Sequence, residues 1–220
     1  MVKAIIFDVG GVLAADVLEP LFLDPVHGIA HQYGLNIDKT SEVSKDLWDK
    51  YSHGVFGTQC TWDQQEVSFW REVSERLSIP YDYDIFMHLT NKFIKPLSGM
   101  KLLLQELDNN RITLAICSNN TEFWFERQSK ELEIDKLFSP KHIVLSSRVG
   151  ESKKNESLKM FKQINEVLSL DKRECLFIDD RIYNINMSIR YGLTSIYFPS
   201  NNDIGCEYLR RIFVHMKILK

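Results

Sequence analysis

Polar side chains follow three separate apolar stretches of this sequence, and their types are suited to catalysis. Each stretch is short and almost entirely apolar, which is typical of a strand buried on both faces. The residues that follow the stretches are Asp8, then Ser118 and Asn119, then Asp179 and Asp180. Parallel strands all point the same way, so their carboxyl ends meet at one edge of a sheet, where ligands bind in this type of fold. The sequence therefore predicts one site that is built from all three strand ends.

The adjacent carboxylates Asp179 and Asp180 indicate a cation, because two neighbouring negative charges repel each other and are costly to hold ionised. Magnesium is a hard ion that prefers oxygen ligands, so it suits this pair. A structural alternative is that Asp179 caps the helix that follows, and Asp8 could likewise be a turn residue at a strand end. Lys153 lies in a polar link that opens a helix; it could be a solvated lysine, and Lys154 could take its place.

The elements that position these residues alternate between strand and helix. Strands are predicted over 2–7, 112–117, 143–145, 175–178 and 194–198. Helices are predicted over 100–109, 121–132, from the link 146–155 to 168, over 184–191, and in the tail from 203. This alternation predicts an α/β fold with a Rossmann-like parallel sheet that carries helices on both faces.

An all-helical block interrupts the alternation directly after the first strand. Apolar residues recur at helical spacing over 18–33, 40–51, 61–77 and 83–94, and Thr61 with Gln64 fits a capping box. We therefore expect an α/β core domain formed by residues 1–14 and 97–220, and an inserted helical cap domain formed by residues 15–96.

Composition limits the classes of function. The 220 residues include 44% hydrophobic and 26% charged residues, as in ordinary globular proteins, and no apolar run is long enough to cross a membrane. The net charge of -3 and the absence of a basic cluster predict no nucleic-acid or membrane partner. Cys117 and Cys175 lie in predicted strands, so we expect buried thiols in a reducing cytoplasm and no structural zinc.

The order of the motifs resembles that of the haloacid dehalogenase-like (HAD) hydrolase superfamily over nearly the whole chain. The similarity is to helical-cap, phosphatase-like members with an Asp-x-Gly-Gly first motif. The four similar segments are Phe7-Asp8-Val9-Gly10-Gly11-Val12-Leu13, Cys117-Ser118-Asn119-Asn120, Gly150-Glu151-Ser152-Lys153-Lys154 and Phe177-Ile178-Asp179-Asp180 with Asn184. The third segment lacks the proline that usually follows the lysine.

The resemblance implies a role for each residue. Asp8 would be the nucleophile that forms an aspartyl-phosphate, Ser118 and the Asn119 amide would bind the phosphoryl oxygens, and Lys153 would neutralise charge. Magnesium would be held by Asp8, the Gly10 carbonyl and Asp180, with Asp179 as a ligand or an anchor. Substrate-binding residues would be Asn119, Gly11, His53 and Trp62, the last two beside a cap loop that also carries Phe56 and Thr58. A structural alternative is that Trp48, Trp62, Phe69 and Trp70 form the core of the helical block.

Gly10 departs from the family pattern, in which most phosphatases carry a second aspartate that serves as general acid and base. The main-chain carbonyl survives this change, but proton transfer by a side chain does not, and such assistance is typically worth ~100- to ~10,000-fold. Activity could be slow, restricted to good leaving groups, or assisted by another residue such as Asp16.

The leading hypothesis is a magnesium-dependent phosphatase of a small phosphorylated metabolite, present as a monomer or homodimer. A 2-haloacid dehalogenase is the alternative enzyme, because its displacement needs no proton donor; it also needs no metal, and Asp179 with Asp180 argues against it. A catalytically silent binding protein is the third reading. A sugar-phosphate mutase is disfavoured, because it depends most on the missing acid.

Overall fold

The computed structural model of this chain describes residues 1–54, 61–199 and 205–220. Its centre is a five-stranded sheet with the order β3-β2-β1-β4-β5, and every neighbouring pair of these strands is parallel. The strands are β1 (Ala4–Phe7), β2 (Thr113–Ser118), β3 (Ile143–Leu145), β4 (Cys175–Asp179) and β5 (Thr194–Tyr197). The predicted parallel α/β sheet is therefore confirmed, with strand bounds within two residues of those expected.

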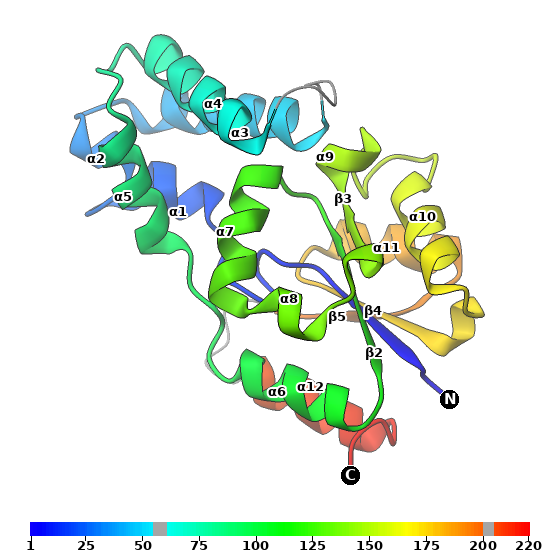
Figure 1. The fold of residues 1–220 in the computed structure, drawn as a ribbon. Helices are drawn as coiled ribbons and strands as arrows, with labels where there is room; N and C mark the ends of the chain where they lie inside the picture. Colours follow the sequence, from blue (N-terminus) through cyan, green and yellow to red (C-terminus); the bar gives the residue numbers. More distant parts are fainter. Residues whose placement is uncertain (55–60, 200–204) are drawn as a thin grey trace.

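Helices cover both faces of the sheet (Figure 1). They are α6 (Met100–Asn109), α7 (Glu122–Leu132), α8 (Ile134–Leu137), α9 (Ser146–Val149), α10 (Lys159–Leu168), α11 (Ile182–Tyr191) and α12 (Gly205–His215), with short 3-10 turns at Pro140–His142 and Lys172–Glu174. Side chains of β1 alternate between the faces: Ile5 and Phe7 pack in one apolar cluster with α6 and α12, while Ala4 and Ile6 pack in another with α10 and α11.

Six described helices lie between β1 and β2, and the first five of them form a separate block beside the sheet (Figure 1). They are α1 (Leu18–Leu23), α2 (Ile29–Gln32), α3 (Ile37–Ser52), α4 (Trp62–Leu77) and α5 (Tyr83–Phe93). The predicted capping box at the start of α4 is confirmed, since Thr61 and Gln64 exchange hydrogen bonds between side chain and backbone. None of the described helices has the length and apolar character needed to cross a bilayer.

The single helix expected over residues 18–33 is wrong, because the chain turns at Asp24. Its Oδ1 accepts hydrogen bonds from the backbone N–H groups of Val26 (3.0 Å) and His27 (2.7 Å), which holds a turn instead of a helix. Gly28 is also needed there, since a Cβ would lie 2.5 Å from the backbone N of Asp24.

The helical block has its own apolar core, which includes two residues from outside the block. Phe123 and Trp124 of α7 are buried in the same cluster as Phe69 and Trp70 of α4. The chain leaves and rejoins the sheet side by side, with Ala15 N donating to Lys95 O at 2.8 Å. The helical block thus rests directly on α7, above the carboxyl ends of the strands. The division into domains 1–14 with 97–220, and 15–96, stays a prediction.

Candidate active site

A buried lysine joins two of the predicted strand ends. Lys153, which is 1% exposed, places its Nζ 2.7 Å from Oδ2 of Asp8 and 2.5 Å from Oδ2 of Asp179. β1 and β4 are neighbours in the sheet, so the residues that follow them are brought together by strand pairing alone. Lys153 is therefore no solvated lysine. Lys154 makes neither contact and is exposed.

Asp179 is held by a fixed set of donors. Its Oδ1 accepts from Arg181 N at 2.8 Å, and Nδ2 of Asn184 lies 3.0 and 3.1 Å from its two carboxylate oxygens. Asp180 points into the neighbouring cavity, where its Oδ2 lies 3.4 Å from Nε of Arg181. Asp179 thus serves as an anchor for Lys153, whereas Asp180 has carboxylate oxygen facing open space.

Burial and the negative charge of Asp8 raise the pKa of both Asp179 and Asp180. Burial raises the pKa of Asp179 to about 7, and the negative charge of Asp8 adds to the effect, against the opposing pull of Lys153. Burial also raises the pKa of Asp180 to about 6, again with a contribution from Asp8. For Lys153, the attraction of Asp179 and Asp8 outweighs burial, so its pKa is raised and it stays charged. The site holds more negative charge than its own cations neutralise.

The carboxylates fit a divalent cation. One carboxylate oxygen from each of Asp8, Asp179 and Asp180 lies within 4.8 Å of the others. Gly11 makes this arrangement possible, because its φ is +75° and a Cβ there would lie 2.4 Å from Oδ2 of Asp180. The residues that could hold magnesium are therefore Asp8 and Asp180, with the Gly10 carbonyl beside them and Asp179 behind.

Ser118 and Asn119 close the site on the β2 side. Ser118 is 1% exposed, and within the described chain its Oγ has no hydrogen-bond partner. A buried hydroxyl without a partner is costly, so this oxygen is free to bind a ligand. Asn119 instead has a structural contact, since its Oδ1 accepts from Lys153 N at 2.9 Å and so positions the lysine loop.

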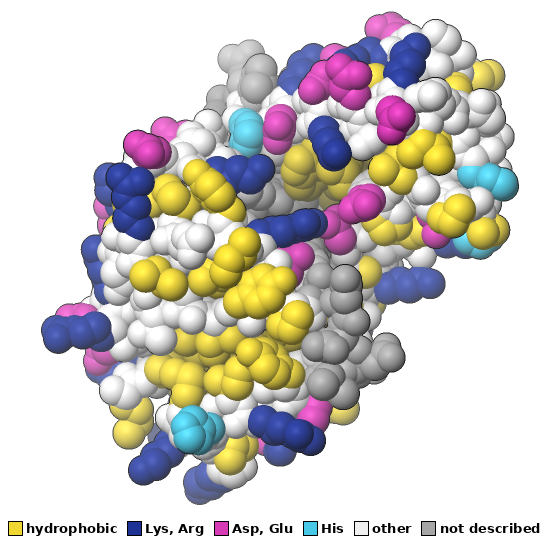
Figure 2. All heavy atoms as spheres, turned by 180° about the vertical axis from the view of Figure 1, so that it is seen from behind, with side chains coloured by type: hydrophobic (Ala, Val, Ile, Leu, Met, Phe, Trp, Pro, Cys, Tyr) yellow, Lys and Arg dark blue, Asp and Glu magenta, His cyan; other side chains and the backbone are white. Residues whose placement is uncertain are grey.

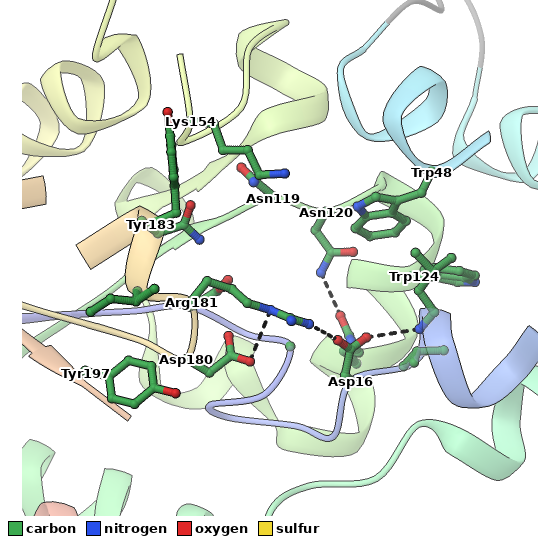
Figure 3. Close-up of a pocket in the computed structure, with 17 residues that line it drawn as sticks. Asp16, Trp48, Asn119, Asn120, Trp124, Lys154, Asp180, Arg181, Tyr183 and Tyr197 are labelled. Carbon is green, nitrogen blue, oxygen red and sulfur yellow. Dashed lines mark hydrogen bonds and ion pairs between the residues drawn. The ribbon is translucent and has the colours of Figure 1, made fainter. Parts of the chain in front are cut away.

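A cavity of about 560 Å³ opens onto Asp8, Asn119 and Asp180 (Figure 3). The more deeply buried Ser118, Lys153 and Asp179 are not among the described residues that line it. Seen from the back of the molecule, acidic and basic side chains meet in the hollow between the helical block and the sheet (Figure 2). Asp8, Gly10 and Asp180 lie on its inner side, and Trp48 and Trp124 form an aromatic wall, stacked with their ring centres 5.1 Å apart. The other lining residues are Asp16, Val17, Leu18, Asn119, Asn120, Gln128, Lys154, Arg181, Ile182, Tyr183, Asn184 and Tyr197.

Two residues expected to face the substrate lie elsewhere. Trp62 lines a second cavity of about 360 Å³, because the capping box begins α4 at this residue and its ring lies under Lys130 of α7, 5.9 Å from the ammonium. His53 ends α3, and the chain there is pressed against α9, since a Cβ at Gly54 would lie 2.1 Å from Ser147 O. Neither is among the described residues that line the Asp8 cavity. Phe56 and Thr58 lie outside the described residues.

The expected proton-transfer substitute Asp16 lines the cavity but is already engaged. Its Oδ2 lies 2.6 Å from Nη2 of Arg181, and its Oδ1 accepts from Leu18 N at 3.1 Å (Figure 3). Both carboxylate oxygens of Asp16 are thus already engaged by protein donors, so neither is free to reach a leaving group in this arrangement. The sequence did not predict that Arg181 lies at the site or that Trp48 lines the cavity. No sequence feature distinguishes Trp48 from the core residues of the same helix.

Comparison with known proteins agrees with this geometry. The parallel sheet, the acidic cluster at its switch point and the helical insertion define a Rossmann-like α/β fold with an inserted helical block. The family of haloacid dehalogenase-like hydrolases matches residues 5–198, and the chain belongs to this family. No curated protein matches the sequence.

Solved structures share the fold at low sequence identity. A HAD family enzyme of Bacteroides thetaiotaomicron in complex with magnesium is 17% identical, with a TM-score of 0.70 over 94% of this chain and 98% of that one. A predicted HAD-like family hydrolase of Porphyromonas gingivalis is 18% identical, with a TM-score of 0.64 over 96% and 98%. An L-2-haloacid dehalogenase of Xanthobacter autotrophicus with covalently bound chloropropionic acid is 16% identical, with a TM-score of 0.60 over 100% and 85%.

Proposed function

We propose that this hydrolase is a magnesium-dependent phosphatase that cleaves a small phosphorylated metabolite through Asp8. The observation that carries the proposal is the contact of Asp8 with the buried ammonium of Lys153, beside a second carboxylate, Asp180, that faces the same cavity. A haloacid dehalogenase also needs a nucleophilic carboxylate, but displacement of a halide needs no metal ion. A phosphatase uses the acid pair to hold a cation.

The chain's own residues would divide the work as follows. Oδ2 of Asp8 attacks phosphorus, and the leaving oxygen departs with the electron pair of the broken P–O bond. Lys153 pairs with the attacking carboxylate and balances charge on the phosphoryl group. The partnerless Oγ of Ser118 donates a hydrogen bond to a phosphoryl oxygen. Water then cleaves the aspartyl-phosphate and regenerates Asp8.

Magnesium, held by Asp8, Asp180 and the Gly10 carbonyl, would supply positive charge against the phosphoryl oxygens. The similarity to a HAD family enzyme solved with magnesium and inorganic phosphate, which is 17% identical, supports this choice of ion. The four carboxylates Asp8, Asp16, Asp179 and Asp180 face only Lys153 and Arg181 in ion pairs among the described residues, which favours binding of a cation.

Phosphate release from p-nitrophenyl phosphate and a panel of phosphorylated metabolites tests the proposal. We expect turnover that depends on magnesium and is lost in Asp8→Asn. If the folded protein releases phosphate from none of these compounds in the presence of magnesium, the result would favour a catalytically silent binding protein instead.

A 2-haloacid dehalogenase is the second candidate, and Gly10 is the observation that favours it. Displacement of a halide needs no proton donor, so the missing aspartate costs nothing in that reaction. Halide release from 2-chloropropionate, equal with and without magnesium, would select this function instead.

A further inference from the structure

The lining of the Asp8 cavity contains a cation that no carboxylate of the described chain neutralises. Asp8 is paired with Lys153, and Asp16 and Asp180 are both paired with Arg181. Lys154 lines the same cavity, is exposed, and makes no ion pair within the part of the chain that the structure describes. Its charge is therefore available to a ligand.

The backbone around Lys154 sets where this charge can act. Asn119 accepts a hydrogen bond from Lys153 N and anchors the loop, while the Lys153 side chain enters the protein and is buried. The next side chain leaves the loop on the open side, and Figure 3 shows Lys154 extending into the cavity beside Asn119. Lys153 thus serves the reacting group, and Lys154 faces the space that remains for the rest of the substrate.

The cavity is large enough to hold the part of a substrate that lies beyond its phosphoryl group. At about 560 Å³ it is far larger than a phosphate ion needs, and it lies in the size range of sites for small organic ligands. A free ammonium in this space would attract a carboxylate or a second phosphate, since charge-assisted hydrogen bonds are stronger than neutral ones.

We propose that Lys154 is a specificity residue that binds a second anionic group of the substrate, so that the preferred substrates are phosphate esters that also carry a carboxylate or another phosphate. This inference rests on the proposed phosphatase function for the placement of the first phosphoryl group at Asp8. The aromatic wall of Trp48 and Trp124 would contact the apolar part between the two anions.

Binding of two matched phosphonates tests this proposal without any turnover. Methylphosphonate and phosphonoacetate differ by one carboxylate, and calorimetric titration into the full-length protein with excess magnesium gives a dissociation constant for each. We expect phosphonoacetate to bind about 5- to 10-fold more tightly than methylphosphonate, which is the scale of one charge-assisted hydrogen bond at a half-open site. In Lys154→Met this ratio should fall to about 1 to 2, and in Lys154→Glu below 1, by the same reasoning.

Lys141→Met is the matched control, because Lys141 is exposed and precedes β3, at the amino-terminal ends of the strands, whereas Lys154 follows β3 at their carboxyl ends. It should keep the wild-type ratio. If Lys154→Met keeps the wild-type ratio of the two phosphonate affinities, the proposal is overturned. An equal loss of affinity for both phosphonates also overturns it, because Lys154 would then bind the phosphoryl group. Failure of the proposed phosphatase function would give a different result. The protein would not hydrolyse p-nitrophenyl phosphate, although the ratio of phosphonate affinities would change in the variants as expected.

Discussion

Gly11 and Asp180 are so close that a side chain on the glycine would displace the acid. A Cβ at Gly11 would lie 2.4 Å from Oδ2 of Asp180, whereas a Cβ at the neighbouring Gly10 would meet nothing within 4 Å. The two glycines therefore have different reasons to be small. Gly11 is required by packing and by its φ of +75°, and Gly10 occupies a place where a larger residue fits.

Gly10→Asp should raise phosphatase activity. The substitution would place a carboxyl group at the cavity beside Asp8, where it can give a proton to the leaving oxygen and later take one from water. We expect kcat for esters of alkyl alcohols to increase by about 10-fold or more, since general acid catalysis typically contributes ~100-fold or more. Esters with good leaving groups, such as p-nitrophenyl phosphate, should gain much less.

Gly11→Ala is the contrasting variant. Its Cβ must push Asp180 aside, so the apparent magnesium affinity should fall by about 10-fold or more, the loss typical of a disturbed ligand shell. Equal effects of the two glycine variants on magnesium affinity would contradict this account.

Lys153→Met should both inactivate and destabilise the protein. The substitution leaves Asp8 and Asp179 buried without their shared partner, and removing one member of a buried ion pair typically costs about 3–5 kcal/mol. Loss of the charge at the nucleophile should lower kcat by about 100-fold or more. Urea unfolding followed by circular dichroism measures the first effect, and phosphate release measures the second.

Lys154→Met gives the comparison for stability. Lys154 is exposed and makes no ion pair within the described residues. The free energy of unfolding of the Lys154→Met variant should therefore stay within about 0.5 kcal/mol of the wild-type value. If the two lysine variants were equally destabilised, the distinct placement of the two side chains would be wrong.

Magnesium binding should strengthen as the pH rises from 5 to 7. The pKa of Asp180 is raised to about 6, so in the metal-free protein a proton occupies this ligand at pH 5 and must leave before the metal can bind. A single proton with this pKa predicts an affinity about 10-fold higher at pH 7 than at pH 5. Calorimetric titration of magnesium at both pH values measures the change, and Asp180→Asn should reduce the dependence along with most of the affinity.

The same shift affects the stability of the metal-free protein with the opposite sign. A carboxyl whose folded pKa lies above its unfolded value stabilises the fold while it is protonated, fully so below about pH 4, and this contribution is lost as the pH rises through about 6. The melting temperature without magnesium should therefore fall between pH 5 and 7, and magnesium should restore it most at the higher pH. A metal-free melting temperature that rises across this range would contradict the assigned shift.

The sequence predicted the parts of this site that depend on strand ends. Asp8, Ser118 and Asp179 each follow an apolar run, and strand pairing brings such residues together whatever the surrounding side chains are. It failed where position depends on packing between elements. The ring of Trp62 turns toward Lys130 rather than toward Asp8, and Trp48 borders the cavity because it stacks on Trp124 of a distant helix. Helical periodicity identifies an apolar face but does not tell which neighbour covers it.

The helical block is also joined to α7 through an ion pair that no sequence pattern revealed. Glu66 of α4 is 0% exposed, and both of its carboxylate oxygens accept from Arg127 of α7, at 3.0 and 2.7 Å. Tyr83 of α5 donates its hydroxyl to the same carboxylate at 2.9 Å. Burial and then this hydrogen bond raise the pKa of Tyr83 to about 12. The carboxylate of Glu66 thus links α4 and α5 of the helical block to α7, which packs beside the sheet.

Arg127→Met should therefore be among the most destabilising single substitutions outside the active site. It leaves the carboxyl group of Glu66 buried with only a tyrosine hydroxyl as partner, and breaking a buried ion pair in this way typically costs about 3–5 kcal/mol in the free energy of unfolding. The double variant Glu66→Leu with Arg127→Met removes both charges and should recover most of that loss, because an apolar pair of similar size can replace a buried ion pair at little cost. Urea unfolding of the wild type, both single variants and the double variant measures the coupling. Additive effects of the two single substitutions would mean that Glu66 and Arg127 do not stabilise the fold as a pair.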